Sequence, residues 1–405
     1  MPAAVQAKQQ IPCEANTYVG MAASVPDVIA PLIREYYKGV APRDIAPQHI
    51  ERREFGFGDF ERTIAFRHMA FDNETKLHSY LVENAPAFVS YSPSEYEDPA
   101  GRPMESKRWM GSELLFDLDA TDMKLSCQKE HGSSWVCQNC LDSVKAETIK
   151  LVEEFLIPDF GVAESEISVN FSGNRGYHVH VTNEEIYKLG PGARKKMTEY
   201  ISGTGIDLKN FFPALGERGM RLEGPMPTDY GWGGRLARGV ISALNGGEAT
   251  LTALGIDKAT ARKLSKNKAE VVLGIATNGN WDKINIEHKA DVWTNVLNGM
   301  AVKQSDQIDS NVTNDVYHII RLPNSIHGKS GLASKKLRSF KEITGFDPMK
   351  EAVAFRKGEI EVVATSPQFS MGGMTFGPYK EEKVKLPAYA AAYLLLKKVA
   401  TLPAN

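Results

Sequence analysis

Two aspartates are spaced so that their carboxylates could lie side by side. Asp117 and Asp119 end the short apolar run ELLFDLD, which starts at Glu113 and is typical of a buried strand. Residues two apart in a strand point to the same face, so the apolar side chains between them would face the core. Adjacent carboxylates repel each other unless a cation lies between them, and hard oxygen ligands suit Mg²⁺ or Mn²⁺. The alternative interpretation of this motif alone is a pair of exposed acids at a strand end.

A glycine-bounded turn, Ser172-Gly-Asn-Arg-Gly-Tyr-His178, joins predicted strands over 167–171 and 177–181. Glycines permit tight turns and let backbone N–H groups approach an anion closely. Arg175 offers a fork of donors that matches phosphate oxygens, and His178 shares one face of the outgoing strand with His180. We expect Arg175 and His178 to be phosphate ligands, whereas His180 is more typical of a structural histidine.

A third cluster combines another acid, Asp309, with the later group Arg321-Leu-Pro-Asn-Ser-Ile-His327-Gly-Lys329-Ser-Gly. Between Gly328 and Lys341 the chain has five basic residues and no acid. This pattern indicates a triphosphate or phosphate-backbone site, with a solvated basic loop as the alternative. It is not a Walker A loop, because the Gly-x4-Gly-Lys-Ser/Thr spacing is missing.

Four soft ligands are spaced C-x3-H-x5-C-x2-C, namely Cys127, His131, Cys137 and Cys140. Thiolates and imidazole at this spacing suit tetrahedral zinc, and a full quartet leaves no open position for water. The sequence therefore predicts a structural zinc site, with reduced loop cysteines as the alternative. Cys13 lies outside the quartet and is expected to have no role.

The composition is that of an ordinary globular protein. The chain has 405 residues, 42% of them hydrophobic and 24% charged, which excludes wholesale disorder. Its 48 Lys and Arg against 50 Asp and Glu give a net charge of −2, so any nucleic-acid binding must come from local basic surface. The longest apolar run, Leu386 to Leu396, is half a bilayer span, and no secretory signal is visible. We expect a soluble intracellular protein with no membrane partner.

The elements around these motifs follow from periodicity and caps. After about fifteen frayed residues, Ser24 is predicted to cap a helix that ends at Gly39, and 54–71 to form a strand, a turn and a second strand. Asp142 is predicted to cap an amphipathic helix ending near Leu156. Beyond residue 188 helices are expected over 193–201, 250–263 and 290–302, separated by glycine-rich breaks such as Gly231, Gly233 and Gly234. Strand and turn patterns return over 308–322 and 359–363, and a buried helix is expected from Pro387 to about Ala400.

This pattern predicts an α/β core interrupted by an insertion. Its N-terminal part would span 1–188, with a zinc knuckle at about 125–142. The helical insertion would span 189–305, and 306–405 would complete the core.

With these residues in view, the chain resembles the catalytic small subunit of archaeal and eukaryotic DNA primase, and the archaeal form more closely. The segment 113–119 resembles that family's first metal motif, and 172–181 its S-G-x-R-G-x-H motif. Asp309 with 321–331 resembles its third motif, and the zinc quartet lies where the family carries its zinc knuckle. Segments 53–55, 65–67 and 386–396 resemble further parts of the archaeal form. Asn174 differs from the eukaryotic form, which has a second arginine there.

The resemblance implies the archaeo-eukaryotic primase (prim-pol) fold, with a mixed β-sheet core, a zinc knuckle and a helical insertion. It implies template-directed synthesis of short RNA or DNA primers on single-stranded DNA by two-metal nucleotidyl transfer. The implied ligands of Mg²⁺ or Mn²⁺ are Asp117, Asp119 and Asp309. The implied nucleotide-binding residues are Ser172, Arg175, His178, Arg321, His327, Lys329, Glu54 and Arg67. The expected partners are a primase large subunit, the DNA template and nucleoside triphosphates, in the cytoplasm, or in the nucleus of a eukaryote.

Two other classes of protein stay open at this point. A zinc-dependent nucleic-acid-binding protein without catalysis would need the cysteines but not the three aspartates. A metal-dependent glycosyltransferase would use the D-x-D pair to hold a nucleotide diphosphate. Neither class accounts for both basic glycine-turn groups together with the zinc quartet.

Overall fold

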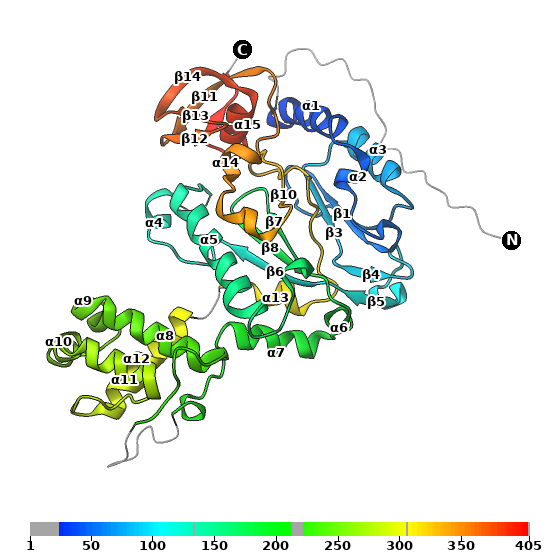
Figure 1. The fold of residues 1–405 in the computed structure, drawn as a ribbon. Coiled ribbons are helices and arrows are strands. Elements are labelled where there is room, and N and C mark those ends of the chain that lie inside the picture. The colour runs from blue at the N-terminus through cyan, green and yellow to red at the C-terminus, as the bar shows by residue number, and fades with distance from the viewer. Residues whose placement is uncertain (1–23, 133, 213–221, 305–306, 404–405) are drawn as a thin grey trace, which may run out of the picture.

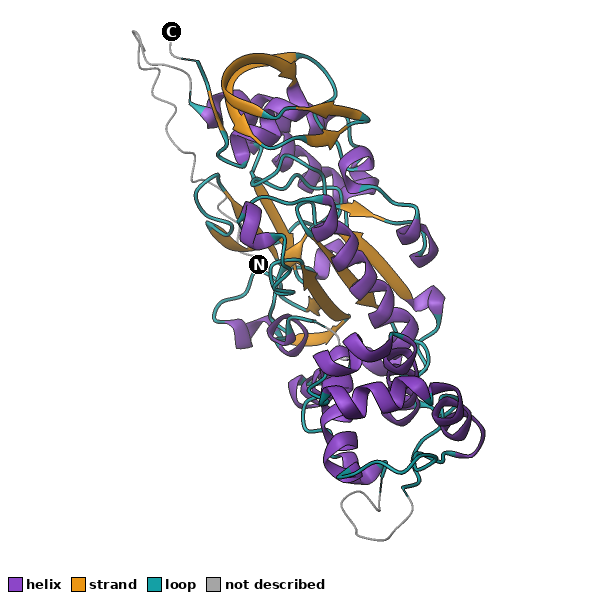
Figure 2. Cartoon of the chain, turned by 90° about the vertical axis from the view of Figure 1, so that its left-hand side faces the viewer, coloured by secondary structure: helices purple, strands orange, loops and turns teal. Residues whose placement is uncertain are grey.

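The computed structural model describes residues 24–132, 134–212, 222–304 and 307–403. Cys13 and the start that was expected to be frayed lie outside these residues. Two small sheets occupy the middle of the molecule, a group of helices gathers at one end, and a curved sheet with the last helix lies at the other (Figures 1 and 2).

The first sheet has the strand order β2-β1-β3-β9. Its strands are β1 (Phe55–Gly58), β2 (Phe66–Met69), β3 (Phe88–Tyr91) and β9 (Ile320–Arg321), and α1 (Val25–Lys38), α2 (Pro42–Ile45) and α3 (Glu74–Asn84) pack beside them (Figure 1). The predicted strand pair within 54–71 is confirmed by β1 and β2. The predicted cap of α1 is also confirmed, because the Ser24 side chain accepts a hydrogen bond from the Asp27 amide and Gly39 follows the last turn.

The second sheet has the order β10-β7-β8-β6 and carries the first two motifs. Its strands are β6 (Leu114–Asp119), β7 (Ile167–Phe171), β8 (Gly176–Val181) and β10 (Lys335–Lys336). The expectation of a mixed sheet is wrong, since every strand pair of the described residues is antiparallel. The physical reason is the hairpin, which inserts β8 between β6 and β7. Those two strands run in the same direction but do not pair with each other.

The crossover between β6 and β7 consists of α4 (Gln128–His131), α5 (Gln138–Lys150) and a π-helical turn over Leu151–Leu156. The predicted end near Leu156 is confirmed, but Asp142 is not the cap. The helix begins one turn earlier, with Cys137 at its N-cap. The Asp142 carboxylate instead accepts a hydrogen bond from Gln138 within the first turn.

A short helix, α6 (Glu184–Tyr187), comes just before residue 188, and helices fill the segment beyond it. They are α7 (Pro191–Ile201), α8 (Gly231–Asn245), α9 (Gly247–Ala253), α10 (Lys258–Lys266), α11 (Lys268–Asn278) and α12 (Lys289–Gln304). The expected break at Gly231–Gly234 is wrong, because α8 starts there. A Cβ on Gly234 would lie 1.8 Å from the Asp229 carbonyl oxygen, so this glycine serves close packing. The helix expected over 250–263 is two helices, since the first ends at Ala253, Gly255 with φ +84° follows in the turn, and Asp257 caps the second.

The C-terminal part returns to the core. The segment expected to contain strands and turns begins with a short helix, α13 (Ser310–Asn314), before β9. Its other elements are α14 (Pro348–Glu351), β11 (Glu359–Ser366), β12 (Phe369–Met371), β13 (Met374–Phe376), β14 (Tyr379–Pro387), α15 (Ala388–Leu396) and β15 (Ala400–Thr401). The buried α15 ends before Ala400, because that residue belongs to β15, which pairs with β11.

The remaining elements are β4 (Ser94–Tyr96), β5 (Trp109–Ser112) and 3₁₀ turns over Ile50–Arg52, Met104–Lys107, Glu164–Glu166, Leu208–Asn210 and Phe340–Thr344. None of the helices in the described ranges combines the length and apolar character that crossing a bilayer requires.

Candidate active site and zinc cluster

Three aspartates meet at the end of β6. Asp117 and Asp119 point to the same face of this strand, while Phe116 and Leu118 are buried on the other. Asp309 comes from a segment almost two hundred residues later, and its amide donates a hydrogen bond of 3.0 Å to the Asp117 carbonyl oxygen. Asp309 is also the N-cap of α13. The fold thus attaches the third predicted acid directly to the strand that carries the first two.

The acids create a strongly negative environment around Asp117. Burial raises the pKa of Asp117 to about 7, and the charges of Asp119 and Asp309 act in the same direction. An exposed fourth acid, Asp122, adds to this effect and was not singled out by the sequence analysis. A carboxylate held in this way gains stability from a bound cation.

His178 lies opposite Asp117 on β8, with its Nε2 atom 3.7 Å from the Asp117 Oδ1 atom. Burial lowers the pKa of His178 well below its usual value, so the imidazole is neutral. Its Nδ1 atom has no hydrogen-bond partner within the described part of the chain. A neutral, buried histidine beside the acids can donate one hydrogen bond to a phosphate oxygen.

Arg175 and Asp119 are paired. The Arg175 Nε atom lies 2.7 Å and 3.0 Å from the two Asp119 carboxylate oxygens, and Asp119 also accepts from Thr121. The carboxylate oxygens of the three aspartates do not all lie within 4.8 Å of one another. Among the described residues, only the cysteine and histidine cluster brings three or more potential metal-ligand atoms that close together.

The glycine turn packs directly on the second basic loop. Gly173 has φ +87°, and a Cβ there would lie 2.9 Å from the Cβ of His327. The Ser330 hydroxyl donates to the Gly173 carbonyl oxygen at 2.5 Å. The Ser172 hydroxyl accepts a hydrogen bond from the Gly176 amide, so it closes the turn in this structure. The second and third sequence motifs are thereby brought into one site.

The basic residues of the third motif differ in exposure. Arg321 is buried with its guanidinium 4.8 Å from the Phe88 ring centre, and its Nε atom has no hydrogen-bond partner among the described residues. His327 stacks edge-on against the same ring, and burial lowers its pKa well below the usual value. Lys329 is exposed at the loop tip, and Lys335 and Lys336 are exposed on the edge strand β10.

Glu54 cannot line a nucleotide pocket itself, because it has no exposed surface. Its carboxylate accepts from the Arg67 Nε atom at 2.7 Å and lies 3.5 Å from the Lys107 ammonium. Arg67 is one-third exposed and also donates to the Tyr317 carbonyl oxygen. Glu54 therefore holds Arg67 in place, and only Arg67 is available to a ligand.

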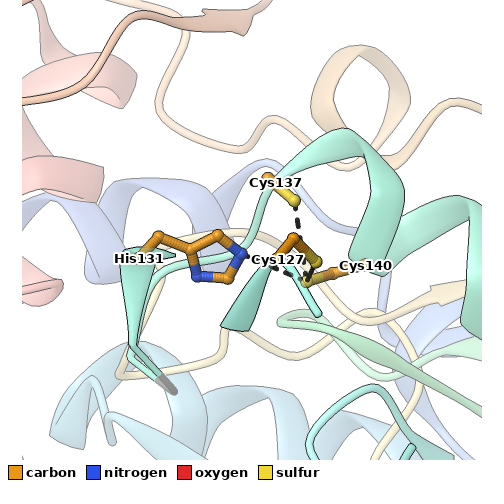
Figure 3. Close-up of side chains that lie close together, drawn as sticks. All are labelled: Cys127, His131, Cys137 and Cys140. Carbon is orange, nitrogen blue, oxygen red and sulfur yellow. Dashed lines mark hydrogen bonds between the residues drawn. The ribbon is translucent and has the colours of Figure 1, made fainter. Parts of the chain in front are cut away.

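The four predicted zinc ligands converge (Figure 3). The Cys140 sulfur lies 3.6 Å from that of Cys127, 3.7 Å from that of Cys137 and 3.5 Å from His131 Nε2. Zinc–sulfur bonds of about 2.3 Å in a tetrahedron place sulfur atoms about 3.8 Å apart, so this geometry fits zinc. The His131 Nδ1 atom is hydrogen-bonded to the Gly132 carbonyl oxygen at 2.7 Å, which directs Nε2 toward the sulfurs.

The cluster also has the electrostatics of a metal site. Burial raises the pKa of Cys140 to about 12, whereas a hydrogen bond from Asn139 lowers that of Cys127 to about 7. Three thiolates this close together require a cation between them.

Two features of the site were not foreseen. A buried relay runs from Arg53 through Glu113 to His180, with distances of 2.8 Å at both steps, so His180 is structural. Lys397, at the end of α15, donates to the Asn174 side-chain oxygen at 2.7 Å. The only signal in the sequence was a pair of lysines after an apolar run, which is common at a helix end.

Comparisons with known proteins agree with this arrangement. The family model described as DNA primase small subunit matches residues 116–339. The DNA primase small subunit PriS of Methanothrix thermoacetophila is 34% identical over 388 residues, which cover 90% of this chain and 95% of that protein. PriS of Methanococcoides burtonii is 32% identical over 385 residues, with 90% and 95% covered. PriS of Nitrosopumilus maritimus is 29% identical over 389 residues, with 88% and 93% covered.

Proposed function

The chain belongs to the DNA primase small subunit family, and from this premise we propose which of its residues carry the reaction. Its function is that of the catalytic subunit of a DNA primase, a nucleotidyltransferase that acts in DNA replication. The open alternatives, a non-catalytic zinc protein and a glycosyltransferase, are set aside by this membership.

We propose that Asp117, Asp119 and Asp309 bind two divalent ions, Mg²⁺ or Mn²⁺. The observation that carries this assignment is the hydrogen bond from the Asp309 amide to the Asp117 carbonyl oxygen, because it unites acids from distant segments. The donor set fits, since three carboxylates crowd a partly buried position where their mutual repulsion favours a cation. Such ions stabilise the attacking and departing oxygens in nucleotidyl transfer.

The incoming triphosphate is assigned to the two basic glycine loops. The Arg175 guanidinium is hydrogen-bonded to Asp119 and would turn from this carboxylate to a phosphate of the nucleotide. Neutral His178 and His327 would donate hydrogen bonds, with Arg321, Lys329 and Ser172 as further contacts. Arg67, held by Glu54, would bind the sugar or base end of the nucleotide.

Zinc is assigned to Cys127, His131, Cys137 and Cys140. A complete quartet leaves no open position for substrate, so the ion would brace the crossover before α5. The template DNA would bind through local basic surface, and the candidates are the exposed lysines of β10, which pairs with the strand that leads into the glycine turn. We also infer a large-subunit partner, and action in the cytoplasm of an archaeal cell.

We further propose a prim-pol core formed by 1–188 and 306–405, with 189–305 inserted. The grouping of α8–α12 at one end supports this division (Figure 1). α7 is bonded to the core, because the buried Arg194 donates to the carbonyl oxygens of Ser112 and Glu113. The separate part of the insertion therefore begins after α7.

The test is primer synthesis on unprimed single-stranded DNA with labelled nucleotides and Mg²⁺ or Mn²⁺, with large subunit present. Asp117→Asn should reduce product by at least about 10³-fold, since a carboxylate ligand is lost. Asp315→Asn, which removes an exposed acid from the Asp309 segment, is the matched control and should retain synthesis. Near-normal synthesis by Asp117→Asn would remove this residue from the metal site.

A further inference from the structure

A buried lysine of α15 lies beside the glycine turn with no acid to neutralise it. Lys397 is only 7% exposed, and its ammonium donates to the Asn174 side-chain oxygen at 2.7 Å. Within the described ranges no carboxylate lies within ion-pair distance of it. Its other neighbour is the Tyr393 ring, whose centre lies 5.4 Å away.

The ammonium lines a pocket in which basic side chains outnumber acids. This pocket, of about 470 Å³, is lined among others by Asn174, Arg175, Lys329, Lys397 and Lys398, and by one acid, Glu61. Three segments that are far apart in sequence meet there, because the Ser330 hydroxyl ties its loop to Gly173 and Gly331 packs against Leu396 of α15. Within the described part of the chain, Arg175 alone among these basic residues has an acid partner, Asp119.

A buried cation among like charges is unstable unless an anion joins it. Burial lowers the pKa of Lys397 to about 7, and the charges of Arg175 and Lys329 act in the same direction, whereas that of Asp119 opposes them. A pocket lined by four cationic side chains and one carboxylate fits a polyanion.

We propose that Lys397 binds the terminal phosphates of the incoming nucleoside triphosphate, together with Arg175 and Lys329. This inference rests on the proposed function, and it adds a residue from the C-terminal helix to the site. The proposal also explains the uncharged residue at position 174. The Asn174 side chain accepts a hydrogen bond from the Lys397 ammonium, so α15 supplies the cation that the turn itself lacks at this position.

A purely structural role for Lys397 predicts a different outcome. The end of α15, the Tyr393 ring and the Asn174 oxygen would then hold the ammonium for the sake of the fold. In that case truncation of the Lys397 side chain would lower the free energy of unfolding and would affect the binding of every nucleotide alike.

The experiment compares ATP and AMP binding by calorimetry in the full chain with Mg²⁺, using wild type, Lys397→Met and Lys380→Met. Lys380 is an exposed lysine of β14 and is the matched control. We expect Lys397→Met to weaken ATP binding by about tenfold or more and AMP binding by less than about twofold, since only ATP has terminal phosphates. Lys397→Gln, which retains a hydrogen-bond donor, should behave in the same way and guards against misfolding of the methionine variant.

A second arm tests the charge itself. Asn174→Arg in the Lys397→Met background should recover ATP affinity, because a guanidinium at 174 starts next to the position of the lost ammonium. Equal loss of ATP and AMP binding, or unchanged ATP binding in both Lys397 variants, would overturn the proposal. Normal ATP binding by these variants, alongside an inactive Asp117→Asn, would refute this inference alone. Synthesis by Asp117→Asn would instead count against the proposed function.

Discussion

At the scale of single residues, two histidines on one strand illustrate how local partners decide a role. His178 and His180 lie two apart on the same face of β8, and both are buried. His180 is hydrogen-bonded to Glu113 through Nδ1, whereas His178 has its Nε2 atom 3.7 Å from Asp117, and each histidine has one ring nitrogen without a hydrogen-bond partner among the described residues. The first is therefore part of the scaffold, and we propose that the second, which lies beside the acids, contacts substrate.

Glu113 gives the clearest prediction of pH dependence. Burial alone would raise the pKa of Glu113, but the charge of Arg53 and the hydrogen bond with His180 hold it at about 2. An acid whose pKa is lower in the folded state than the usual 4.5 stabilises the fold above pH 4.5, and this contribution is lost as the pH falls toward 2. Glu113→Gln should thus lower the free energy of unfolding by about 3 kcal/mol at pH 7.

Urea unfolding between pH 7 and pH 2 measures the difference in the free energy of unfolding between wild type and Glu113→Gln. This difference should shrink steadily below pH 4.5. Glu97→Gln, at an exposed ion pair with Arg108, is the control and should change stability by less than about 1 kcal/mol at any pH. A difference for Glu113→Gln that did not depend on pH would contradict the assigned ion pair.

At the scale of elements, the glycine turn between β7 and β8 brings the two basic loops together. Gly173→Ala adds a Cβ at φ +87°, 2.9 Å from the Cβ of His327, and should separate the loops. Gly161→Ala is matched for backbone strain, since Gly161 has φ +67° but nothing within 4 Å of its added Cβ. Both variants should lose about 1–2 kcal/mol of stability from the conformation alone.

Only Gly173→Ala should also raise the KM for nucleotides, by about tenfold, because it displaces His327 from the phosphate site. Steady-state extension of a primed template measures this. An equal effect of both substitutions would mean that the turn contributes strain but no positioning.

We propose that the crossover between β6 and β7 depends on zinc for its stability. Cys140→Ser should reduce bound zinc from about one per chain to near zero and lower the melting temperature by about 5 °C or more. Cys13→Ser is the control, and its zinc content should equal that of wild type. Metal analysis of the purified proteins gives the answer, and a Cys140→Ser protein that retained a full equivalent of zinc would exclude this quartet.

The elements were predictable where short-range rules decide them. The cap at Ser24, the hairpin at 172–176 and the buried strand of the D-x-D motif all follow from local residues. Local rules mispredict the elements where tertiary packing prevails. Gly234 marks close contact with Asp229 and not a break, and Cys137 starts α5 ahead of the better cap Asp142. The strand order could not be predicted from local rules either, because it depends on the position of β8 between β6 and β7, with which it pairs in antiparallel fashion.

At the scale of the whole molecule, the site is assembled from segments that no spacing rule connects. The family resemblance foresaw that Asp309 joins Asp117, but only the fold shows the backbone hydrogen bond that brings them together. Lys397 points inward because α15 packs against the glycine turn. Glu54 is completely buried because the first sheet packs against the motifs. Such contacts between distant elements carry no local sequence signature.

The whole assembly also suggests how initiation is divided between subunits. Initiation must hold two nucleotides at once, and the phosphate site that we propose, around Arg175, accounts for one of them. We expect the isolated chain to extend a primed template, and addition of a purified large subunit to raise synthesis on unprimed DNA by at least about tenfold. Equally strong initiation by the chain alone would show that it holds both nucleotides itself.

The central claim is that acids from two distant segments form one nucleotidyl-transfer site, and Asp309 tests it most directly. The measurement is extension of a primed template by one labelled nucleotide in saturating Mn²⁺, comparing wild type with Asp309→Asn. The account predicts that Asp309→Asn loses at least about 10³-fold in rate while its unfolding transition and DNA affinity match those of wild type. Extension by Asp309→Asn at the wild-type rate would contradict it.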